Sequence, residues 1–561
     1  MSRLFLLVTI IFTRLPAHSL IIHNLPAGAM TSFQDDFQLY EISASLTEKG
    51  LANYQVVIGY IYEYIDFIKR ELDLASTASS SSTENPFQRI WSELRSVNYL
   101  KYRYQAKDSP YELAQSTARN MLYYPVDDVF SIGYILNERI SIGGLQQVVK
   151  MLNRNNAVTF LRSKTFHDIP DDSTPYVDHR YHREKWYGSY YTRELLDLTD
   201  ISMDNAAFQS HLTLPGVNKY ISHNLISQLP GIMEEDVTAA KRVLRSPPPV
   251  QLSSNSAGAR VYHSRDVAFA PQPKAAIYTM LYSMNTNVQL NALFNSIFDQ
   301  MTMNKYYDAA VAGVYSSIQL GMRGIHVTTN GFSDTLSVTN PLIQLNLVTI
   351  KEFIATIQML PDHRSISTLF NICKEKMLRS LFSWNKERPD VQADGYLSYI
   401  LTEHGELIDN KISELQQVTL DDMVTHVVGV VDKINHVTTY VHGNIDEVGA
   451  SNIHRDAMTV VSNKCEAGSG YELPSRARLV TTKGALIAMN TPNAEDENSA
   501  LIQYFQCGPA SPKLSAYIIL TRRLFSEPLF DLLRTKKQLG YIVHFSTNSH
   551  GITLAFTLYP L

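Results

Sequence analysis

The sequence predicts a multidomain α+β protein, and three observations lead to this fold class. Strand-like segments alternate along the chain with longer segments of helical periodicity. The chain has 561 residues, more than one domain usually holds. Hydrophobic residues make up 45% and charged residues 18%, as in ordinary globular proteins. The net charge of -5 gives no reason to expect a nucleic-acid partner.

The first part of the chain is expected to form one unit of strands and helices. Residues Phe37–Ser45 alternate as a strand does, and the apolar residues of Tyr54–Ile68 recur at helical spacing. Asn85 and Ser109 each precede a proline, so each is expected to cap a helix. Ala157–Arg162 reads as a further strand.

The N-terminus is open to two interpretations. Arg3 precedes the apolar run Leu4–Phe12, and Ala17, His18 and Ser19 offer small residues around a cleavage point, which is the pattern of a secretory signal. The run is too short to span a bilayer. The alternative is that it forms a buried strand, or is foreign sequence joined to a truncated gene.

Two stretches in the middle of the chain are expected to be loops or linkers. The polar, proline-bearing segment Asp168–Arg183 contains His179 and His182, which are spaced for two metal contacts. A solvated loop is therefore the preferred interpretation. Ser246–Gly258, with three consecutive prolines, is expected to be an exposed linker.

A second unit is expected from about Val261 to Asn444. Its predicted elements are a strand at Ala275–Met284, helices at Val288–Gln300 and Leu369–Phe382, and a closing strand at Val437–Val441. The three cysteines, Cys373, Cys465 and Cys507, lie far apart, so no zinc ribbon, redox pair or disulfide framework is implied.

The most informative segment lies near the C-terminus. Ser526 is expected to cap a helix, Arg534 to fall in its last turn, and Tyr541 to begin a strand after Gly540. Arginine and tyrosine side chains placed together can hold a peptide carbonyl and stabilise charge that develops on its oxygen. The alternative is a solvated helix end followed by a buried strand.

This segment, SEPLFDLLRTKKQLGYIV, resembles the late signature of the insulinase/pitrilysin family of zinc metallopeptidases, in its insulin-degrading branch. Other stretches resemble the same branch in the same order: SASLTEKGL, YYPVDDVFSIGYIL, EKWYGSYYTRE, LTLPGVNKYISHNL, FAPQPKAAI, YYDAAVAGVYSSI and HGNI. The resemblance covers the chain from about Asn24 to its end.

The resemblance implies α+β repeats of mostly antiparallel sheet covered by helices, truncated at both ends. The implied domains are a signal or non-homologous leader at 1–23, the remainder of a second repeat at 24–200 and an inter-half connector at 201–260. A third repeat follows at 261–445 and the front part of a fourth at 446–561. The first repeat of the family, which carries the zinc, would lie upstream.

The resemblance also implies site residues. Arg534 and Tyr541 match the residues that reach a zinc-bound substrate and stabilise its carbonyl or oxyanion, acting in trans to a zinc repeat. Ala27 and Gly28 match a strand that pairs with the N-terminus of a substrate, although alanine stands here where the family has a second glycine.

Peptidases of this family use the inverted zinc motif His-x-x-Glu-His. No two of the seventeen histidines are four residues apart, so neither that motif nor its mirror occurs in this sequence. His404, Gly405 and Glu406 are the nearest approach, and His442 is assigned to a strand end without a metal role. We therefore expect this chain to bind no cofactor, and zinc to belong to the complete family enzyme.

Three functions remain open. The chain can belong to a zinc endopeptidase that is inactive without a zinc-bearing repeat, it can be a non-catalytic peptide-binding or regulatory module, or it can be a truncated gene product. The expected partners are peptide substrates and a catalytic insulinase-type half or a second copy. No transmembrane segment is expected. The family resemblance implies the cytoplasm, whereas a signal at residues 1–19 would imply secretion.

Overall fold

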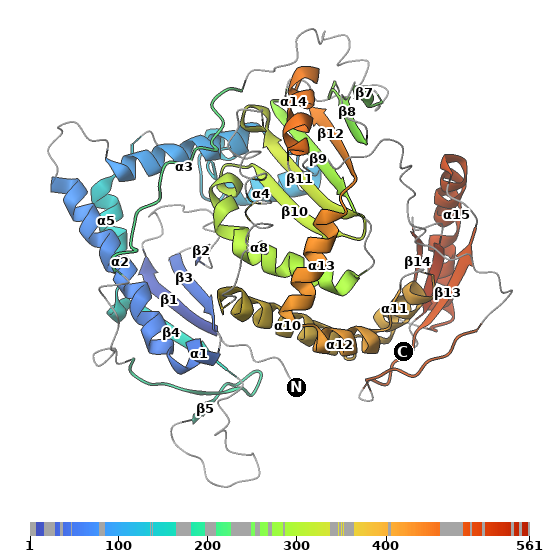
Figure 1. Cartoon of the computed structure of the whole chain (residues 1–561). Helices are drawn as coiled ribbons and strands as arrows, with labels where there is room; N and C mark the ends of the chain where they lie inside the picture. The colour runs from blue at the N-terminus through green and yellow to red at the C-terminus, as the bar shows by residue number, and fades with distance from the viewer. Residues whose placement is uncertain are drawn as a thin grey trace. The chain divides into compact units, whose positions relative to one another are not determined.

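The computed structural model divides into two compact units, Met1–Ile221 and Ser222–Leu561 (Figure 1). The structure describes residues 7–15, 29–33, 38–46, 48–77, 85–134, 136, 139–163, 181–196 and 209–225 of the first part. It further describes residues 248–252, 258–267, 272–283, 287–336, 346, 349, 352, 364–401, 405–459, 486–493, 496–507, 511–539, 543–548 and 553–558.

The first unit is built on a four-stranded antiparallel sheet of order β2-β3-β1-β4. Its strands are β1 Leu7–Leu15, β2 Ala29–Phe33, β3 Gln38–Ser45 and β4 Ala157–Arg162, and a separate hairpin joins β5 Tyr181–Arg183 to β6 Tyr190–Thr192. The helices are α1 Glu48–Ala52, α2 Tyr54–Thr77, α3 Pro86–Arg103, α4 Pro110–Asn120 and α5 Ile142–Met151, with short 3-10 turns at Val126–Asp128 and Arg154–Asn156.

One apolar cluster packs the helices of this unit against its sheet. Ile58 and Leu72 of α2 are fully buried, and Phe87 of α3 and Val149 of α5 join them. The two predicted caps are present, since Asn85 accepts the Phe87 N–H and Ser109 forms a capping box with Glu112. Residues Leu7–Phe12 of the apolar N-terminal run lie in β1, a strand between β3 and β4.

The second unit contains a six-stranded sheet of order β10-β11-β9-β12-β8-β7. The strands are β7 Val250–Leu252, β8 Ala259–Ser264, β9 Lys274–Tyr282, β10 Tyr315–Gly321, β11 Gly324–Phe332 and β12 His436–Gly443. All neighbouring pairs are antiparallel except β8 and β12, which run parallel. Gly324 has a φ of 116°, and a Cβ there would lie 2.0 Å from the Leu281 carbonyl oxygen, so the turn into β11 requires glycine.

Helices cover this sheet and pack on one another: α8 Val288–Val311, α10 Arg364–Trp384, α11 Pro389–Leu401, α12 Ile408–Gln417, α13 Leu420–Asp432 and α14 Glu447–Met458, with a 3-10 turn η3 at Ser333–Leu336. Helix α8 contributes to two cores. Its Phe294 and Phe298 face the sheet residues Leu281 and Val437, while Leu293 packs with Leu415 and Cys373 of the outer helices.

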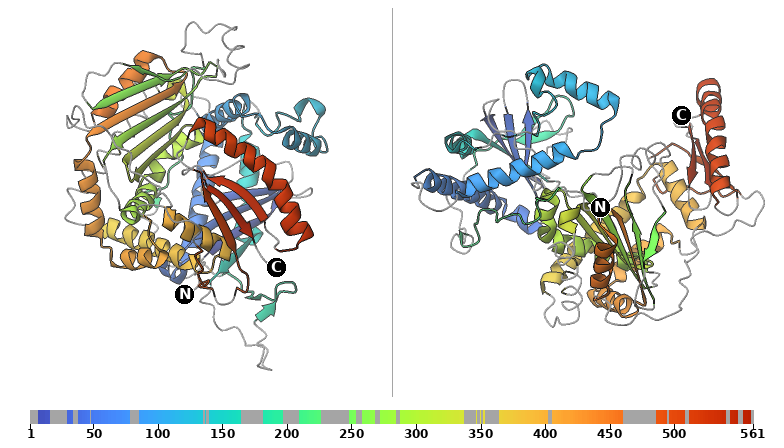
Figure 2. Two further views of the ribbon diagram at one scale, coloured as in Figure 1. Left: turned by 90° about the vertical axis from the view of Figure 1, so that its right-hand side faces the viewer. Right: turned by 90° about the horizontal axis from the view of Figure 1, so that it is seen from above.

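A three-stranded antiparallel sheet of order β13-β15-β14 forms the C-terminal part, with β13 Leu501–Gln506, β14 Val543–Asn548 and β15 Thr553–Leu558. Helix α15 Pro512–Phe530 lies along it (Figure 2). The prediction that Ser526 caps a helix is wrong: Ser511 is the cap, and Ser526 lies inside α15, where its hydroxyl donates to the Arg522 carbonyl.

The predicted α+β fold class is confirmed, with mostly antiparallel sheets and covering helices. The strand and helix predictions for the second unit correspond to β9, α8, α10 and β12, and Cys373 is buried. In the part of the chain that the structure describes, no helix is both long and apolar enough to cross a membrane.

Candidate functional site

Arg534 lies on a widened helical turn at the end of α15. The chain passes from α15 directly into the π-helical turn η4, Asp531–Lys536. Pro528 lies inside α15 and has no N–H to donate, and proline is a common cause of such irregularity in a helix. A π-turn in an otherwise regular helix is frequently found at functional sites. The predicted placement of Arg534 in the last helical turn therefore agrees with the structure.

The chain leaves this turn through a backbone conformation that is uncommon for residues other than glycine. Gln538 has a φ of 51°, in the left-handed region. The amides of Lys537 and Leu539 donate back to the carbonyls of Leu532 and Leu533, both at 2.9 Å. These bonds close the C-terminus of the helix and fix the direction in which the chain leaves it.

The guanidinium of Arg534 lies over an aromatic ring of its own helix. Its Cζ is 5.0 Å from the centroid of the Phe530 ring, a cation–π contact. Arg534 is half-buried, while Lys536 on the same turn pairs with Asp531 at 2.7 Å. The contact of Phe530 with Arg534 was not predicted from the sequence, although a spacing of four residues in a helix is the signal that could have done so.

The strand after the junction is fixed to α15 by stacked aromatic rings. Phe525 of α15 and Phe545 of β14 lie 6.0 Å apart with nearly parallel planes, and Val543 and Phe545 are buried. Tyr541 itself lies outside the described residues, two positions before Val543. That the side chains of Arg534 and Tyr541 lie together therefore stays a prediction.

The second predicted site also adjoins a described element. Ala27 and Gly28 lie outside the described residues and directly precede β2. Strand β2 is at one end of its sheet and pairs only with β3 among the described strands. An end strand has backbone N–H and C=O groups on its outer side that can pair with an extended peptide.

Sequence reasoning did not single out the β5–β6 hairpin as a surface feature. Both oxygens of Glu184 accept backbone amides, from Trp186 and Tyr187, each at 2.6 Å. These two bonds, the Tyr187 amide first, lower the pKa of the Glu184 carboxyl. Trp186 and Tyr187 are 80% and 92% exposed, so the tight turn presents two aromatic rings to solvent.

Comparison with known proteins relates the chain to one family. A model of the middle or third domain of peptidase M16 matches residues 102–414. The chain belongs to the peptidase M16 family, the insulinase family. It is 24% identical over 543 residues to the A-factor-processing enzyme of Saccharomyces cerevisiae, covering 94% of this chain and 47% of that protein.

Other M16 relatives match this chain with similar identity and coverage. The insulin-degrading enzyme of Homo sapiens is 25% identical over 537 residues, covering 93% of this chain and 47% of the enzyme. The putative zinc protease mug138 of Schizosaccharomyces pombe is 26% identical over 537 residues, with coverages of 94% and 49%. The chain therefore spans about half the length of the curated relatives that it matches.

A solved structure supports the fold. The crystal structure of pitrilysin matches with a TM-score of 0.58 at 17% identity, and the match covers 100% of this chain and 57% of that one. The M16 assignment thus agrees with the resemblance found in the sequence, and the similarity to pitrilysin extends over the complete chain.

Among the residues that the structure describes, this M16 chain offers no set of side chains that fits a zinc site. Within the described ranges, no three histidine, cysteine, aspartate or glutamate side chains are grouped so that they could hold a metal ion. His442 lies at the end of β12, with its Nδ1 3.1 Å from the Ser264 hydroxyl. The His182 ring lies 5.4 Å from the Tyr191 ring in a tilted arrangement on the β5–β6 hairpin, whereas His179 and His404 lie outside the described residues.

Proposed function

We propose that this chain handles peptide substrates in an insulinase-type metalloendopeptidase and supports proteolysis when a zinc-bearing repeat is supplied. The observation that carries the proposal is the alignment of 94% of the chain with about half of a peptidase relative. Alone, the chain has neither a metal-activated water nor another assigned nucleophile, so we expect no peptidase activity from it.

Arg534 and Tyr541 are proposed to contact the carbonyl of the bond that is cleaved. The guanidinium of Arg534 is half-buried beside Phe530, which limits its motion and its hydration. A preorganised cation and a phenol hydroxyl aimed at a developing oxyanion stabilise the transition state more than the bound substrate. Both groups would act on a substrate that the zinc of another repeat activates.

Ala27, Gly28 and β2 are proposed to bind the N-terminal segment of a peptide. The support is the position of β2 at the end of its sheet, where an added strand would pair with backbone groups. Such pairing depends little on the side chains of the peptide. We accordingly propose that this edge contributes affinity and that Arg534 and Tyr541 contribute to the rate.

The domain boundaries given above are retained as part of the proposal. A second-repeat remainder at 24–200, a connector at 201–260, a third repeat at 261–445 and a fourth-repeat portion at 446–561 account for the family resemblance. Residues 1–23 are proposed as a leader, of which Leu7–Leu15 pairs as β1 with β3 and β4. The catalytic first repeat would come from a longer form of the chain, from a partner chain or from a second subunit.

The test combines this chain with a separately expressed zinc-bearing half of an M16 relative and measures cleavage of a quenched fluorescent peptide. Removal of one oxyanion donor typically lowers kcat by about 10²–10³. We expect Tyr541→Phe to lower kcat in this range with little change in KM. Tyr517→Phe, at an exposed position of α15, is the control. An unchanged kcat for Tyr541→Phe would refute its assigned role.

A non-catalytic peptide-binding module is the second candidate, and the lack of His-x-x-Glu-His in the sequence favours it. This candidate predicts binding of a labelled peptide to the chain alone, with affinity that no zinc-bearing half alters. Fluorescence anisotropy measures it directly. A chain that binds no peptide by itself yet completes an active peptidase would exclude this candidate and leave the first.

A further inference from the structure

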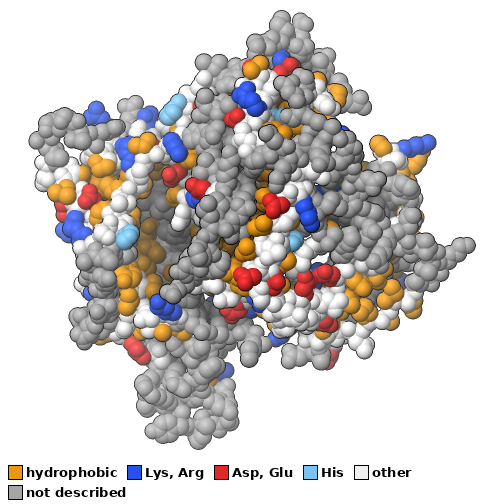
Figure 3. All heavy atoms as spheres, viewed as in Figure 1, with side chains coloured by type: hydrophobic (Ala, Val, Ile, Leu, Met, Phe, Trp, Pro, Cys, Tyr) orange, Lys and Arg blue, Asp and Glu red, His pale blue; other side chains and the backbone are white. Residues whose placement is uncertain are grey.

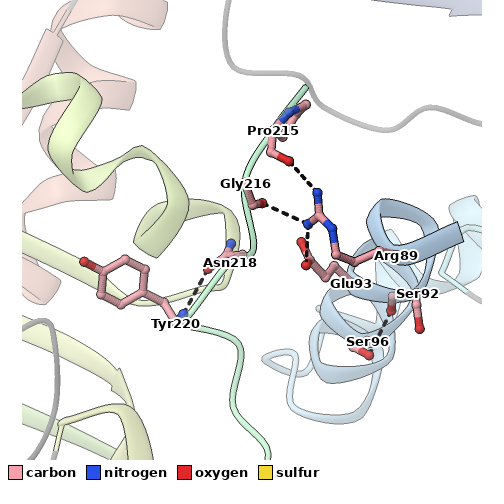
Figure 4. Close-up of polar contacts among 8 residues, drawn as sticks. All are labelled: Arg89, Ser92, Glu93, Ser96, Pro215, Gly216, Asn218 and Tyr220. Atoms are coloured by element: carbon pink, nitrogen blue, oxygen red, sulfur yellow. Dashed lines mark hydrogen bonds and ion pairs between the residues drawn. The ribbon is translucent and has the colours of Figure 1, made fainter. Parts of the chain in front are cut away.

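The segment Pro215–Asn224 is held at its N-terminal end by Arg89 of helix α3. The guanidinium of Arg89 donates to the carbonyl of Pro215 and, at 3.0 Å, to that of Gly216 (Figure 4). Its other partner is Glu93, one helical turn further along, at 2.8 Å. Leu214, immediately before this pair of carbonyls, packs against the core of the first unit. The first end is therefore fixed by an apolar contact and by two charge-assisted hydrogen bonds.

The same segment is held at its other end by an aspartate of the second unit. The carboxylate of Asp334, on η3, accepts the hydroxyl of Ser222 at 2.7 Å. It also accepts the backbone amides of His223 and Asn224 at 3.1 and 3.0 Å. Ser222 is buried, and three donors on consecutive residues converge on one carboxylate. Hydrogen bonds to a charged acceptor are stronger than those between neutral groups.

Between these anchors lies a segment of five residues, Val217–Ile221. Within it the Asn218 side chain accepts the Tyr220 amide at 3.0 Å, which forms a local turn. Tyr220 and Ile221 are only 3% and 5% exposed. The preceding residue, Lys219, is exposed. The segment thus contains an exposed lysine on a backbone that is held on both sides.

We propose that Arg89 and Asp334 clamp the segment Pro215–Asn224 at both ends, so that only a short tether is left between the two clamps. Within Pro215–Asn224, the clamps leave only Val217–Ile221 able to change conformation without breaking charged hydrogen bonds. Arg89 and Asp334 are on this account positioning residues, which act on the path of the chain and contact no substrate. The inference is independent of the proposed peptidase function.

The tether can be tested by proteolysis because Lys219 is a trypsin site. A protease must draw several residues on either side of the cleaved bond into an extended form, so cutting after Lys219 requires release of at least one clamp. When local opening is fast, the cleavage rate follows the population of the open form. Exposure of Lys219 alone would predict rapid cutting, whereas a clamped tether predicts slow cutting.

The experiment measures cleavage of the full chain by limiting trypsin, with each cut located by mass spectrometry. Arg89→Met keeps the aliphatic stem and removes both donors, and Asp334→Asn keeps the size of the side chain and removes the charge. We expect each variant to be cut after Lys219 at least about tenfold faster, which is about 1.4 kcal/mol. The double variant is expected to be cut faster than either.

Two controls match the charge changes at exposed positions. Lys101→Met lies on the same helix as Arg89, and Asp421→Asn lies on α13. Both are expected to leave cleavage after Lys219 unchanged. Cutting after Lys374, which lies within helix α10 and donates to the Val418 carbonyl, serves as an internal reference for general unfolding.

Milder variants keep the test decisive if Asp334→Asn or Arg89→Met fails to fold. Arg89→Lys keeps the charge but loses the planar fork that reaches both carbonyls, and Ser222→Ala removes one of the three bonds to Asp334. Each should give a smaller acceleration at Lys219. Equal rates in parent and variants would overturn the proposal, as would an acceleration at Lys374 that matches the one at Lys219.

Discussion

The six-stranded sheet and the three-stranded sheet of the second unit differ in how completely their helices are packed. In the first region, helix α8 alone buries nine residues and joins two apolar cores. In the second, α15 buries only Ile518, and Ile519, Leu520 and Leu524 are more than half exposed. Figure 3 shows hydrophobic side chains reaching the visible surface near α11 and α15.

This difference shows that Arg534, for which we propose a role in the chemistry, lies in the less completely covered of the two regions. Arg534 and the π-turn are at the end of α15, while the well-packed sheet carries no residue assigned to substrate. Large exposed apolar surfaces usually mark a site of contact with another molecule. Segments that bind ligands are also commonly drawn from the less stable parts of a protein.

The largest contrast is expected from truncating one leucine in each region. Leu293 of α8 is 0% exposed, and Leu293→Ala should destabilise the fold by about 2–5 kcal/mol, because it leaves a cavity. Leu524 of α15 is 62% exposed, and Leu524→Ala should change stability by no more than about 0.5 kcal/mol. Urea denaturation of both variants checks this, and equal losses would abolish the distinction between the regions.

Hydrogen exchange gives a second test, without mutation. The amides of β9 and β12 are central in their sheet and should open only with the unfolding of that region. Those of β13, β14 and β15 should exchange at least about a hundredfold faster, which corresponds to about 2.7 kcal/mol. Protection factors from mass spectrometry would measure both groups in one sample. Similar protection would show that the two regions unfold together.

Much of the fold follows from short-range signals in the sequence. Asn85 and Ser109 before proline located two helix starts, and the spacing of apolar residues located α2 and α8. The prediction failed at Ser526 because a serine shortly before a proline, here Pro528, can also lie inside a helix. There the hydroxyl bonds to the Arg522 carbonyl, and the helix continues through Pro528 into a π-turn.

The candidate site was predictable only in part. Resemblance selected Arg534, but local patterns could not reveal that the chain would leave its turn through Gln538 in a left-handed conformation. The clamps at Pro215 and Ser222 join residues more than 100 positions apart in sequence. Contacts of that separation depend on the complete fold, so neither Arg89 nor Asp334 carries a signal in the sequence.

A matched pair of helix-cap variants is expected to change stability by less than the leucine variants do. Thr419 forms a capping box with Asp422 at the start of α13, and Ser511 accepts the Leu514 amide at the start of α15. Thr419→Ala should cost about 1 kcal/mol in global stability. Ser511→Ala removes a similar bond but should mainly increase exchange within α15, if that region opens by itself. Denaturation and hydrogen exchange on both variants would distinguish these outcomes.

The smallest expected effect is a dependence of the well-packed region on pH. Burial, and next the positive charge of neighbouring His436, lower the pKa of His454, whose Nδ1 lies 2.9 Å from the Thr439 hydroxyl. Burial first and Arg260 second likewise lower the pKa of His436. Above about pH 6.5 these imidazoles are neutral both folded and unfolded, so they do not change stability with pH.

Below about pH 6.5 these imidazoles bind protons in the unfolded chain, whereas in the folded chain their lowered pKa values keep them neutral. The free energy of unfolding therefore falls as the pH falls towards the lowered pKa values. The amides of the six-stranded region should then lose part of their greater protection relative to those of the three-stranded region. Protection factors of β12, corrected for intrinsic exchange, should decline with acidification, and His454→Gln should make that decline shallower. His211→Gln, at an exposed position, should leave it unchanged. A decline of the same slope in parent and His454→Gln would show that buried His454 does not couple the packing of α14 to pH.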